Sequence, residues 1–251
     1  MGTPTLAIIG GTGLDALVDI KLDKREIIIT PFGEPSGPVT RGNLFGQEVL
    51  FLPRHGYSHS IAPHLINYRA NIWALRDAGA DSILAVAAVG GIRSDMGPGQ
   101  VVIPDQIIDY SWGRKSTFFD GTYETRDSKV THIDFTHPYS NALRQRLFNA
   151  ASAAKIDVVD GGTYAATQGP RLETAAEITR LERDGCHLVG MTGMPEASLA
   201  RELELHYACC AVVANWAAGK TDGIITMEEI ETNLTGGMQQ VSELIKALMS
   251  A

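Results

Sequence analysis

Cysteine is scarce in this sequence, and its scarcity excludes two common ways of holding a fold together. The 251 residues contain three cysteines, and two of them, Cys209 and Cys210, are neighbours within an apolar run. So few thiols, placed in this way, indicate neither a disulfide framework nor a zinc site. We therefore expect the cysteines to be small core residues and the chain to contain no metal site.

Basic residues and long apolar runs are also lacking. The 21 Lys and Arg stand against 29 Asp and Glu, which gives a formal net charge of -8. A nucleic-acid-binding surface normally carries a basic excess, and a membrane-spanning helix needs roughly 18 or more apolar residues. Residues 1–5 lead directly into a β-like run without the basic and apolar regions of a signal peptide. We expect a soluble cytoplasmic protein with no nucleic-acid or membrane partner.

Short apolar runs alternate with helical patterns along the chain, and the apolar fraction is an ordinary 44%. This alternation predicts an α/β fold with a mixed β-sheet flanked by helices on both faces, in a single domain over residues 1–251. Hairpin-like runs before residue 63 predict some antiparallel pairing. Strands are expected over residues 5–9, 26–29, 49–52, 83–89, 101–103, 162–166, 188–189 and 207–214. Helices are expected from Pro63 to Gly79 and over residues 140–154, 174–183, 196–204 and 227–248.

Residues 110–135 have no clear period and are rich in aromatic residues, glycine and charge. Loops longer than about 15 residues without structure of their own are usually functional or held by a partner. We therefore interpret this segment as a loop that covers a site or contacts another subunit.

Three short segments combine an anion site with a flat apolar site. Thr12 lies in a glycine turn. The Thr12 hydroxyl and the main-chain amides of the turn can together face an anion. Arg54 and His55 follow an apolar run, at the carboxyl end of a predicted strand, where ligands gather in α/β sheets. Met191 and Thr192 place a thioether beside a hydroxyl donor. Together these segments indicate phosphate and a nucleoside as ligands.

The glycine turn has two other interpretations. Residues 11–16 fit the dinucleotide pattern G-x-G-x-x-A, but strand-like structure resumes at residue 25 and leaves little room for the helix that this motif requires. We therefore reject the dinucleotide site. A tight turn that binds nothing remains an alternative. His59 and His64 are expected to be ordinary loop residues.

Two further residues have the chemistry to recognise a purine. The carboxylate of Glu173 can accept a hydrogen bond from N1–H of a 6-oxopurine, and the amide of Asn215 can donate to N7 or O6. The alternatives are an acidic residue favoured at a helix N-terminus for Glu173 and a turn residue after a strand for Asn215.

The motifs also resemble those of a known family. They occur at residues 8–14, 54–56, 67–75, 169–171 and 190–196. Over nearly its whole length the chain resembles the trimeric purine nucleoside phosphorylases, and within them the methylthioadenosine phosphorylase branch. The resemblance implies the phosphorylase fold, a homotrimer, inorganic phosphate as co-substrate and no other cofactor.

Residue by residue, the resemblance assigns the phosphate shell to Thr12, Arg54, His55 and Thr192. It assigns contacts with ribose and base to Met191. It also implies that His132 reaches a neighbouring subunit's site.

Near the base, the chain departs from that branch. Glu173 and Asn215 stand where the branch has serine and aspartate, and Trp216 and Ala217 replace tyrosine and aspartate. Aspartate suits a 6-aminopurine, so these differences favour a 6-oxopurine.

At the 5' end of the sugar, phosphorylases of ordinary nucleosides tend to offer a histidine, whereas this chain has Met227, with Ile230 one helical turn further along. An apolar pocket there favours a methylthio group. The alternative is that both side chains belong to the core of an amphipathic helix.

The function expected from these residues is phosphorolysis of S-methyl-5'-thioinosine to hypoxanthine and 5-methylthioribose 1-phosphate. Asn215 and Glu173 would stabilise the departing base. The alternatives are phosphorolysis of inosine and guanosine, phosphorolysis of methylthioadenosine and, from a different class, nucleoside binding without catalysis. A nicotinamide dehydrogenase is the weakest alternative.

Overall fold

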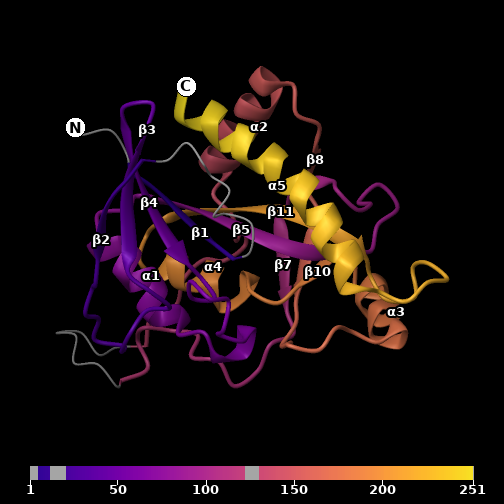
Figure 1. Ribbon diagram of the computed structural model, residues 1–251. Helices are drawn as coiled ribbons and strands as arrows, with labels where there is room; N and C mark the ends of the chain where they lie inside the picture. Colours follow the sequence, from indigo (N-terminus) through magenta and orange to yellow (C-terminus); the bar gives the residue numbers. More distant parts are fainter. Residues whose placement is uncertain (1–4, 12–20, 122–129, 251) are drawn as a thin grey trace.

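The chain folds around one mixed β-sheet (Figure 1). The computed structural model describes residues 5–11, 21–121 and 130–250. The strands are β1 (Leu6–Gly10), β2 (Lys21–Glu26), β3 (Val39–Leu44), β4 (Gln47–Pro53), β5 (Ser82–Gly91), β6 (Val101–Ile103), β7 (Gln106–Asp109), β8 (Val158–Asp160), β9 (Thr163–Ala166), β10 (Leu188–Gly190) and β11 (His206–Trp216). The helices are η2 (Pro63–Leu65), α1 (Tyr68–Asp77), α2 (Asn141–Ala154), α3 (Ala175–Arg183), α4 (Gly193–Glu202) and α5 (Met227–Ser250). In the part of the chain described, no helix combines the length and apolar character needed to cross a bilayer.

Both parallel and antiparallel pairs occur in the sheet, as predicted. β4, β1, β5 and β11 run parallel through its centre. β2, β3 and β4 pair antiparallel, which confirms the expectation for the segment before residue 63. Because the central strands are parallel, the residues that follow β1, β4 and β11 emerge at the same edge of the sheet.

The sheet divides along β5, and this division creates space for a ligand. β1 pairs with β5 only as far as Ala85, whereas β10 joins β5 antiparallel at Gly90 and Gly91. Among the described strands, none pairs with this side of β5 over residues 86–89. The other side of β5 stays paired with β11. A row of main-chain groups is therefore left facing the gap between β1 and β10.

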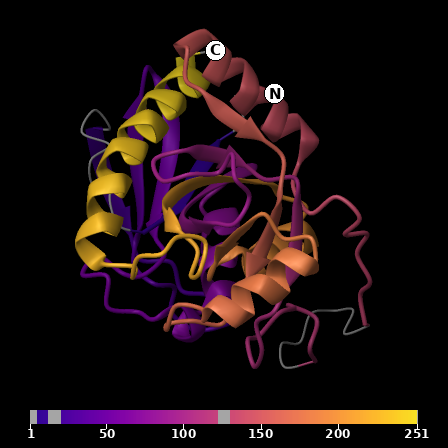
Figure 2. The ribbon, with the colours of Figure 1, turned by 90° about the vertical axis from the view of Figure 1, so that its right-hand side faces the viewer.

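Side chains alternate between two cores on opposite faces of the sheet, as the period of a strand requires. In β1, Leu6 and Ile8 belong to the core that includes side chains of α2 and α5. Ala7 and Ile9 belong to the core that includes side chains of α1 and α4. The long helix α5 crosses one face next to α2, and Figure 2 shows the same arrangement after a quarter turn. The predicted helices on both faces are confirmed.

Helix starts with clear capping signals occur where the sequence predicts them. The Ser140 hydroxyl accepts a hydrogen bond from the amide of Leu143 at the start of α2. Thr174 and Glu177 form a reciprocal capping box at the start of α3. The predicted ranges 140–154 and 174–183 are confirmed to within one residue.

The predicted helix start at Pro63 is wrong. Residues Pro63–Leu65 form a single 3-10 turn, and Ile66 is extended. The helix begins at Tyr68, because the Asn67 side chain accepts from the amide of Ala70 and caps it.

The predicted strand over residues 26–29 is also wrong. Pairing between β2 and β3 ends where Glu26 meets Val39, so Ile27 and Ile29 lie beyond the ladder and are exposed. Their β-branched side chains fit the strand pattern, but no pairing continues there. β3, β7 and β8 were not predicted.

Candidate active site

A cavity of about 540 Å³ lies at the gap beside β5. Its floor includes residues 86–90 of β5, and its walls come from the loops after β1, β4, β9, β10 and β11 together with the first turns of α5. Nine of the residues that line it are predicted from the sequence: Arg54, His55, Glu173, Met191, Thr192, Asn215, Ala217, Met227 and Ile230. Segments far apart in the sequence therefore meet in one cavity.

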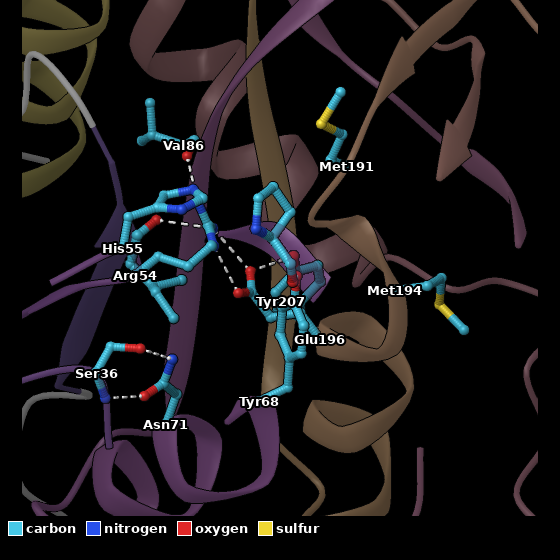
Figure 3. Close-up of polar contacts among 12 residues, drawn as sticks. Ser36, Arg54, His55, Tyr68, Asn71, Val86, Met191, Met194, Glu196 and Tyr207 are labelled. Atoms are coloured by element: carbon cyan, nitrogen blue, oxygen red, sulfur yellow. Dashed lines mark hydrogen bonds and ion pairs between the residues drawn. The ribbon is translucent and has the colours of Figure 1, made fainter. Parts of the chain in front are cut away.

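Arg54 is almost completely buried at the end of the β1–β5 ladder (Figure 3). Its Nε and Nη2 donate to the two carboxylate oxygens of Glu196 at 2.7 and 2.8 Å. Nη2 also donates to the Ile9 carbonyl at 3.1 Å, and Nη1 donates to the Val86 carbonyl at 2.9 Å. The guanidinium thus satisfies main-chain oxygens at the point where the ladder between the strands ends.

These contacts correct the expected role of Arg54. As a member of the predicted phosphate shell, Arg54 would be expected to offer its bidentate fork to phosphate, but that fork is occupied by Glu196. Within the described residues, Nη1 keeps one N–H without an acceptor, so Arg54 has a single donor left for the cavity. Burial alone would lower the pKa of Arg54, but the Glu196 carboxylate outweighs burial and the pKa is raised. The arginine remains charged.

His55 is held as a neutral imidazole. Its Nδ1 lies 2.8 Å from the Ile61 carbonyl oxygen, which requires the hydrogen to be on Nδ1. Burial is the main cause that lowers the pKa of His55 to about 4; the charge of Arg54 acts in the same direction, and the hydrogen bond with the Ile61 carbonyl opposes both. The unprotonated Nε2 can therefore accept a hydrogen bond, for example from the hydroxyl of monohydrogen phosphate.

The depressed pKa of His55 predicts an acid-sensitive fold. Between about pH 6.5 and about pH 4 the unfolded chain binds a proton at His55 that the folded chain refuses, so the free energy of unfolding falls as the pH falls through this window. Urea titrations at about pH 7.5 and about pH 5 measure the slope. His55→Asn retains a donor for Ile61 and should reduce the pH dependence, whereas the control His132→Asn on an exposed loop should preserve it. An unchanged slope in His55→Asn would contradict this assignment.

Met191 and Thr192 occupy the turn between β10 and α4, and glycines determine the course of that turn. A Cβ on Gly190 would lie 2.1 Å from the Tyr164 hydroxyl oxygen, and one on Gly169 would lie 2.4 Å from the Met191 sulfur. Only glycine fits either place, so Met191 lies directly on the main chain of the neighbouring loop. Thr192 is buried at the N-cap of α4, and its side chain makes no capping hydrogen bond.

Glu173 lines the cavity from the loop after β9, and Asn215 lines it from the end of β11. One Glu173 oxygen accepts from the Thr167 hydroxyl at 2.7 Å. The Asn215 amide donates to the Trp216 carbonyl at 2.7 Å. Each side chain is thereby oriented and keeps further hydrogen-bonding capacity, in its second oxygen for Glu173 and in an N–H and its oxygen for Asn215.

Trp216 does not line this cavity, contrary to its predicted role in substrate binding. Successive side chains of a strand point to opposite faces, so Trp216 is directed away when Asn215 faces the cavity. Its indole ring instead approaches Gly97 and lines a separate cavity of about 350 Å³ with Arg93 and Lys220. Ala217, one residue further along, returns to the main cavity.

The first turns of α5 form an apolar wall. Met227, Ile230 and Leu234 line the cavity at the spacing of one helical face. Met227 is 66% exposed, so it lies at the rim and not in the core. The core alternative for Met227 is therefore excluded.

Besides Trp216, two predicted site residues are not placed at the cavity. Thr12 lies outside the described residues, although the adjacent Gly11 lines the cavity. His132 is exposed on its loop and does not line the cavity of its own chain. Its role in a neighbouring subunit's site stays a prediction.

Three residues at or beside the site were missed. His59 was assigned to an ordinary loop, but it lines the cavity with its ring centroid 4.5 Å from that of His55. Glu196 was noticed only as part of a motif, and Arg114 only as part of an irregular loop. Arg54 follows an apolar run, and a buried guanidinium needs a carboxylate partner. This requirement was the signal in the sequence that could have identified Glu196.

Comparison with known proteins agrees with the geometry. A family model described as the phosphorylase superfamily matches residues 5–250. A probable S-methyl-5'-thioinosine phosphorylase of Pseudomonas syringae pv. tomato is 56% identical over 245 residues, which cover 98% of each chain. A 6-oxopurine nucleoside phosphorylase of Pyrococcus furiosus is 45% identical, with 97% of this chain and 91% of the relative covered.

A solved structure has the same fold. The methylthioadenosine phosphorylase of Schistosoma mansoni in complex with adenine superposes with a TM-score of 0.91 at 31% identity. The superposition covers 99% of this chain and 91% of the other. The phosphorylase fold expected from the sequence is confirmed.

Proposed function

This chain belongs to the phosphorylase superfamily, and we propose that it is a pentosyltransferase that cleaves S-methyl-5'-thioinosine with inorganic phosphate. The products are hypoxanthine and 5-methylthioribose 1-phosphate, which places the enzyme in purine salvage. One observation carries the proposal: a single cavity combines Arg54, Asn215 and Met227, which suit phosphate, a 6-oxopurine and an apolar 5' substituent.

The reaction requires positioning more than covalent chemistry from the protein. An oxygen of monohydrogen phosphate attacks the anomeric carbon, and the bond from that carbon to N9 breaks. The bonding electrons pass to the purine, which takes up the proton that the phosphate gives up. Positive charge develops on the sugar and is stabilised by the bound phosphate. Arg54, His55 and Thr192 hold the phosphate, with Thr12 as a fourth ligand carried over from the family resemblance.

The purine leaves with hydrogen bonds to the protein. The free N–H of Asn215 donates to N7 or O6, and the free oxygen of Glu173 accepts from N1–H. Met191 contacts the ribose and base, and Ala217 leaves room beside the base. These contacts favour hypoxanthine over adenine because adenine has no N1–H and carries a donor at position 6.

The direct test is phosphate-dependent release of base from methylthioinosine, methylthioadenosine, inosine and guanosine in parallel. We expect methylthioinosine to be cleaved with the highest kcat/KM and no release without phosphate. Equal or better cleavage of methylthioadenosine would overturn the base assignment. Nucleoside affinity without any release of base would indicate a binding protein.

A second candidate is a phosphorylase of ordinary 6-oxopurine nucleosides, since the Pyrococcus furiosus relative carries that name. The two functions differ at the 5' position, where Met227 forms an apolar rim. Met227→His should lower the preference for methylthioinosine over inosine about tenfold, because it exchanges an apolar contact for a donor. The ratio of the two kcat/KM values measures this. The control Ile224→Gln, an exposed neighbour, should leave the ratio unchanged, and an unaltered ratio in Met227→His would contradict the role of this rim.

The family resemblance extends the proposal to assembly and location. We place the enzyme in the cytoplasm as a homotrimer in which His132 contributes to a neighbouring site. Phosphate and nucleoside are its small-molecule partners, and we assign it no metal or organic cofactor. Analytical ultracentrifugation tests the trimer, and His132→Ala in a trimer of normal mass tests the shared site.

A further inference from the structure

Arg114 connects three walls of the cavity from a loop outside it. Its Nη1 donates to the Met191 carbonyl at 2.8 Å and also to the Met194 carbonyl. Its Nη2 donates to the carbonyls of Thr167 and Gln168 at 3.1 and 2.9 Å. One side chain therefore holds the loop after β10 to the loop after β9.

The link continues to a third loop through a tyrosine. Arg114 Nη1 lies 3.2 Å from the Tyr68 hydroxyl, which itself donates to the Pro63 carbonyl at 2.9 Å. Pro63 belongs to the wall that also contains His55. In Figure 3, Tyr68 lies beside Glu196, and Met191 and Met194 lie to the right of these two residues.

The chemistry of these contacts separates Arg114 from the substrate-binding residues. Its Nε donates to the Gln168 side-chain oxygen at 3.3 Å, so each nitrogen of the guanidinium has a protein acceptor. Arg114 does not line the cavity. Because every nitrogen of the Arg114 guanidinium donates to a protein oxygen, the guanidinium holds the loops together and does not bind phosphate.

The Arg114 loop has an anchor of its own. The buried ring of Phe118 packs with Phe32 and Trp73. Arg69 donates to the Asp120 carboxylate at 2.7 Å. Arg114 is therefore presented from a segment that is attached to α1 independently of the cavity loops.

We propose that Arg114 is a positioning residue that sets the spacing between the phosphate end and the base end of the cavity. Thr192 lies between the Met191 and Met194 carbonyls, where the loop after β10 enters α4, and Glu173 follows the two carbonyls held on the β9 loop. Removing the guanidinium frees both loops together. This inference rests on the proposed function, because that function assigns phosphate to one end of the cavity and the base to the other.

The test compares Arg114→Met, which keeps the apolar stem, with Arg114→Lys and with Lys115→Met at the exposed neighbouring position. We expect KM for phosphate and KM for the nucleoside each to rise about tenfold in Arg114→Met, below the roughly 100-fold loss that a 1 Å misplacement of reacting groups can cause. Arg114→Lys should restore only part of the loss, because an ammonium cannot reach carbonyls on both loops in the same fork. Lys115→Met should match the wild type.

Tyr68→Phe keeps the size of the ring and tests the third wall if Arg114→Met does not fold. It should raise KM for phosphate by a few-fold and affect the nucleoside less, because only the loop that carries His55 is released. A variant that merely loses folded protein would lower kcat at unchanged KM. Unchanged KM values in both Arg114→Met and Arg114→Lys, or an equal change in Lys115→Met, would overturn the proposal.

The affinity for hypoxanthine, measured by calorimetry, keeps this test separate from the proposed function. It requires no turnover. If the wild type binds hypoxanthine but releases no base from nucleosides, phosphorolysis fails while the positioning role is still tested. Weaker binding in Arg114→Met than in Lys115→Met would then support the role, and equal binding would overturn it.

Discussion

Replacement of Glu196 by glutamine is expected to lower the free energy of unfolding by about 3 to 5 kcal/mol, because it leaves the charge of Arg54 buried without a counterion. The carboxylate receives two hydrogen bonds from Arg54 and a third from the Tyr207 hydroxyl at 2.9 Å. Glutamine has the same shape but places an N–H₂ donor against one of these donors. Urea denaturation of both proteins at neutral pH measures the difference.

The same substitution at an exposed pair provides the control. Glu243 pairs with Lys246 on α5 at 3.0 Å, and Glu243→Gln should cost less than about 1 kcal/mol. The combined variant Arg54→Met, Glu196→Met, Tyr207→Phe removes charge and partners together and should recover much of the stability lost in Glu196→Gln, although it should be inactive. Equal stability of Glu196→Gln and Glu243→Gln would show that the buried ion pair contributes no more to the free energy of unfolding than the exposed pair.

Asn215→Asp is expected to lower the preference for methylthioinosine over methylthioadenosine about 100-fold. The aspartate cannot donate to N7 or O6 of hypoxanthine. It also loses the hydrogen bond to the Trp216 carbonyl and brings two acceptors together at 2.7 Å. Adenine suffers less from the change, because an acceptor suits its amino group or a protonated N7. The ratio of kcat/KM for the two nucleosides is the measurement.

Asn233→Asp provides a control with the same chemistry. The Asn233 amide on α5 donates at 2.8 Å to the carbonyl of Ala214, the residue before Asn215 in β11, but Asn233 does not line the cavity. Its replacement should reduce stability while the substrate ratio is kept. An equal change of the ratio in both variants would mean that the strand, and not the amide of Asn215, determines base preference.

Local signals explain which parts of the fold were predictable. The core strand β5 and the helix α2 have apolar runs or caps that identify them without long-range information. The start of α1 was wrong because Asn67 caps it while also donating to the Phe32 carbonyl, a contact 35 residues away. β7 and β8 are short, and their strand character depends on partners that the sequence does not reveal.

The candidate site was predictable where a residue's chemistry shows in its own motif. Arg54, Asn215 and Met227 all line the cavity as predicted. The hydrogen bonds among the site residues were harder to predict. Arg54 and Glu196 are 142 residues apart, so the sequence does not show that Glu196 occupies the donor fork of Arg54. Arg114 was missed because most of its partners are main-chain oxygens, which leave no trace in the residue types around them.

The gap beside β5 has a consequence for how such a site can change over time. Its floor includes residues 86–90 of β5, and over residues 86–89 this edge of the strand offers unpaired main-chain groups, which every amino acid except proline supplies in the same form. In the proposed function, base preference and the 5' pocket depend instead on side chains from β11, from other loops and from α5. Mutation can therefore exchange one nucleoside for another at the walls while the floor persists. This separation offers a structural reason why relatives at 45% and 56% identity carry different substrate names.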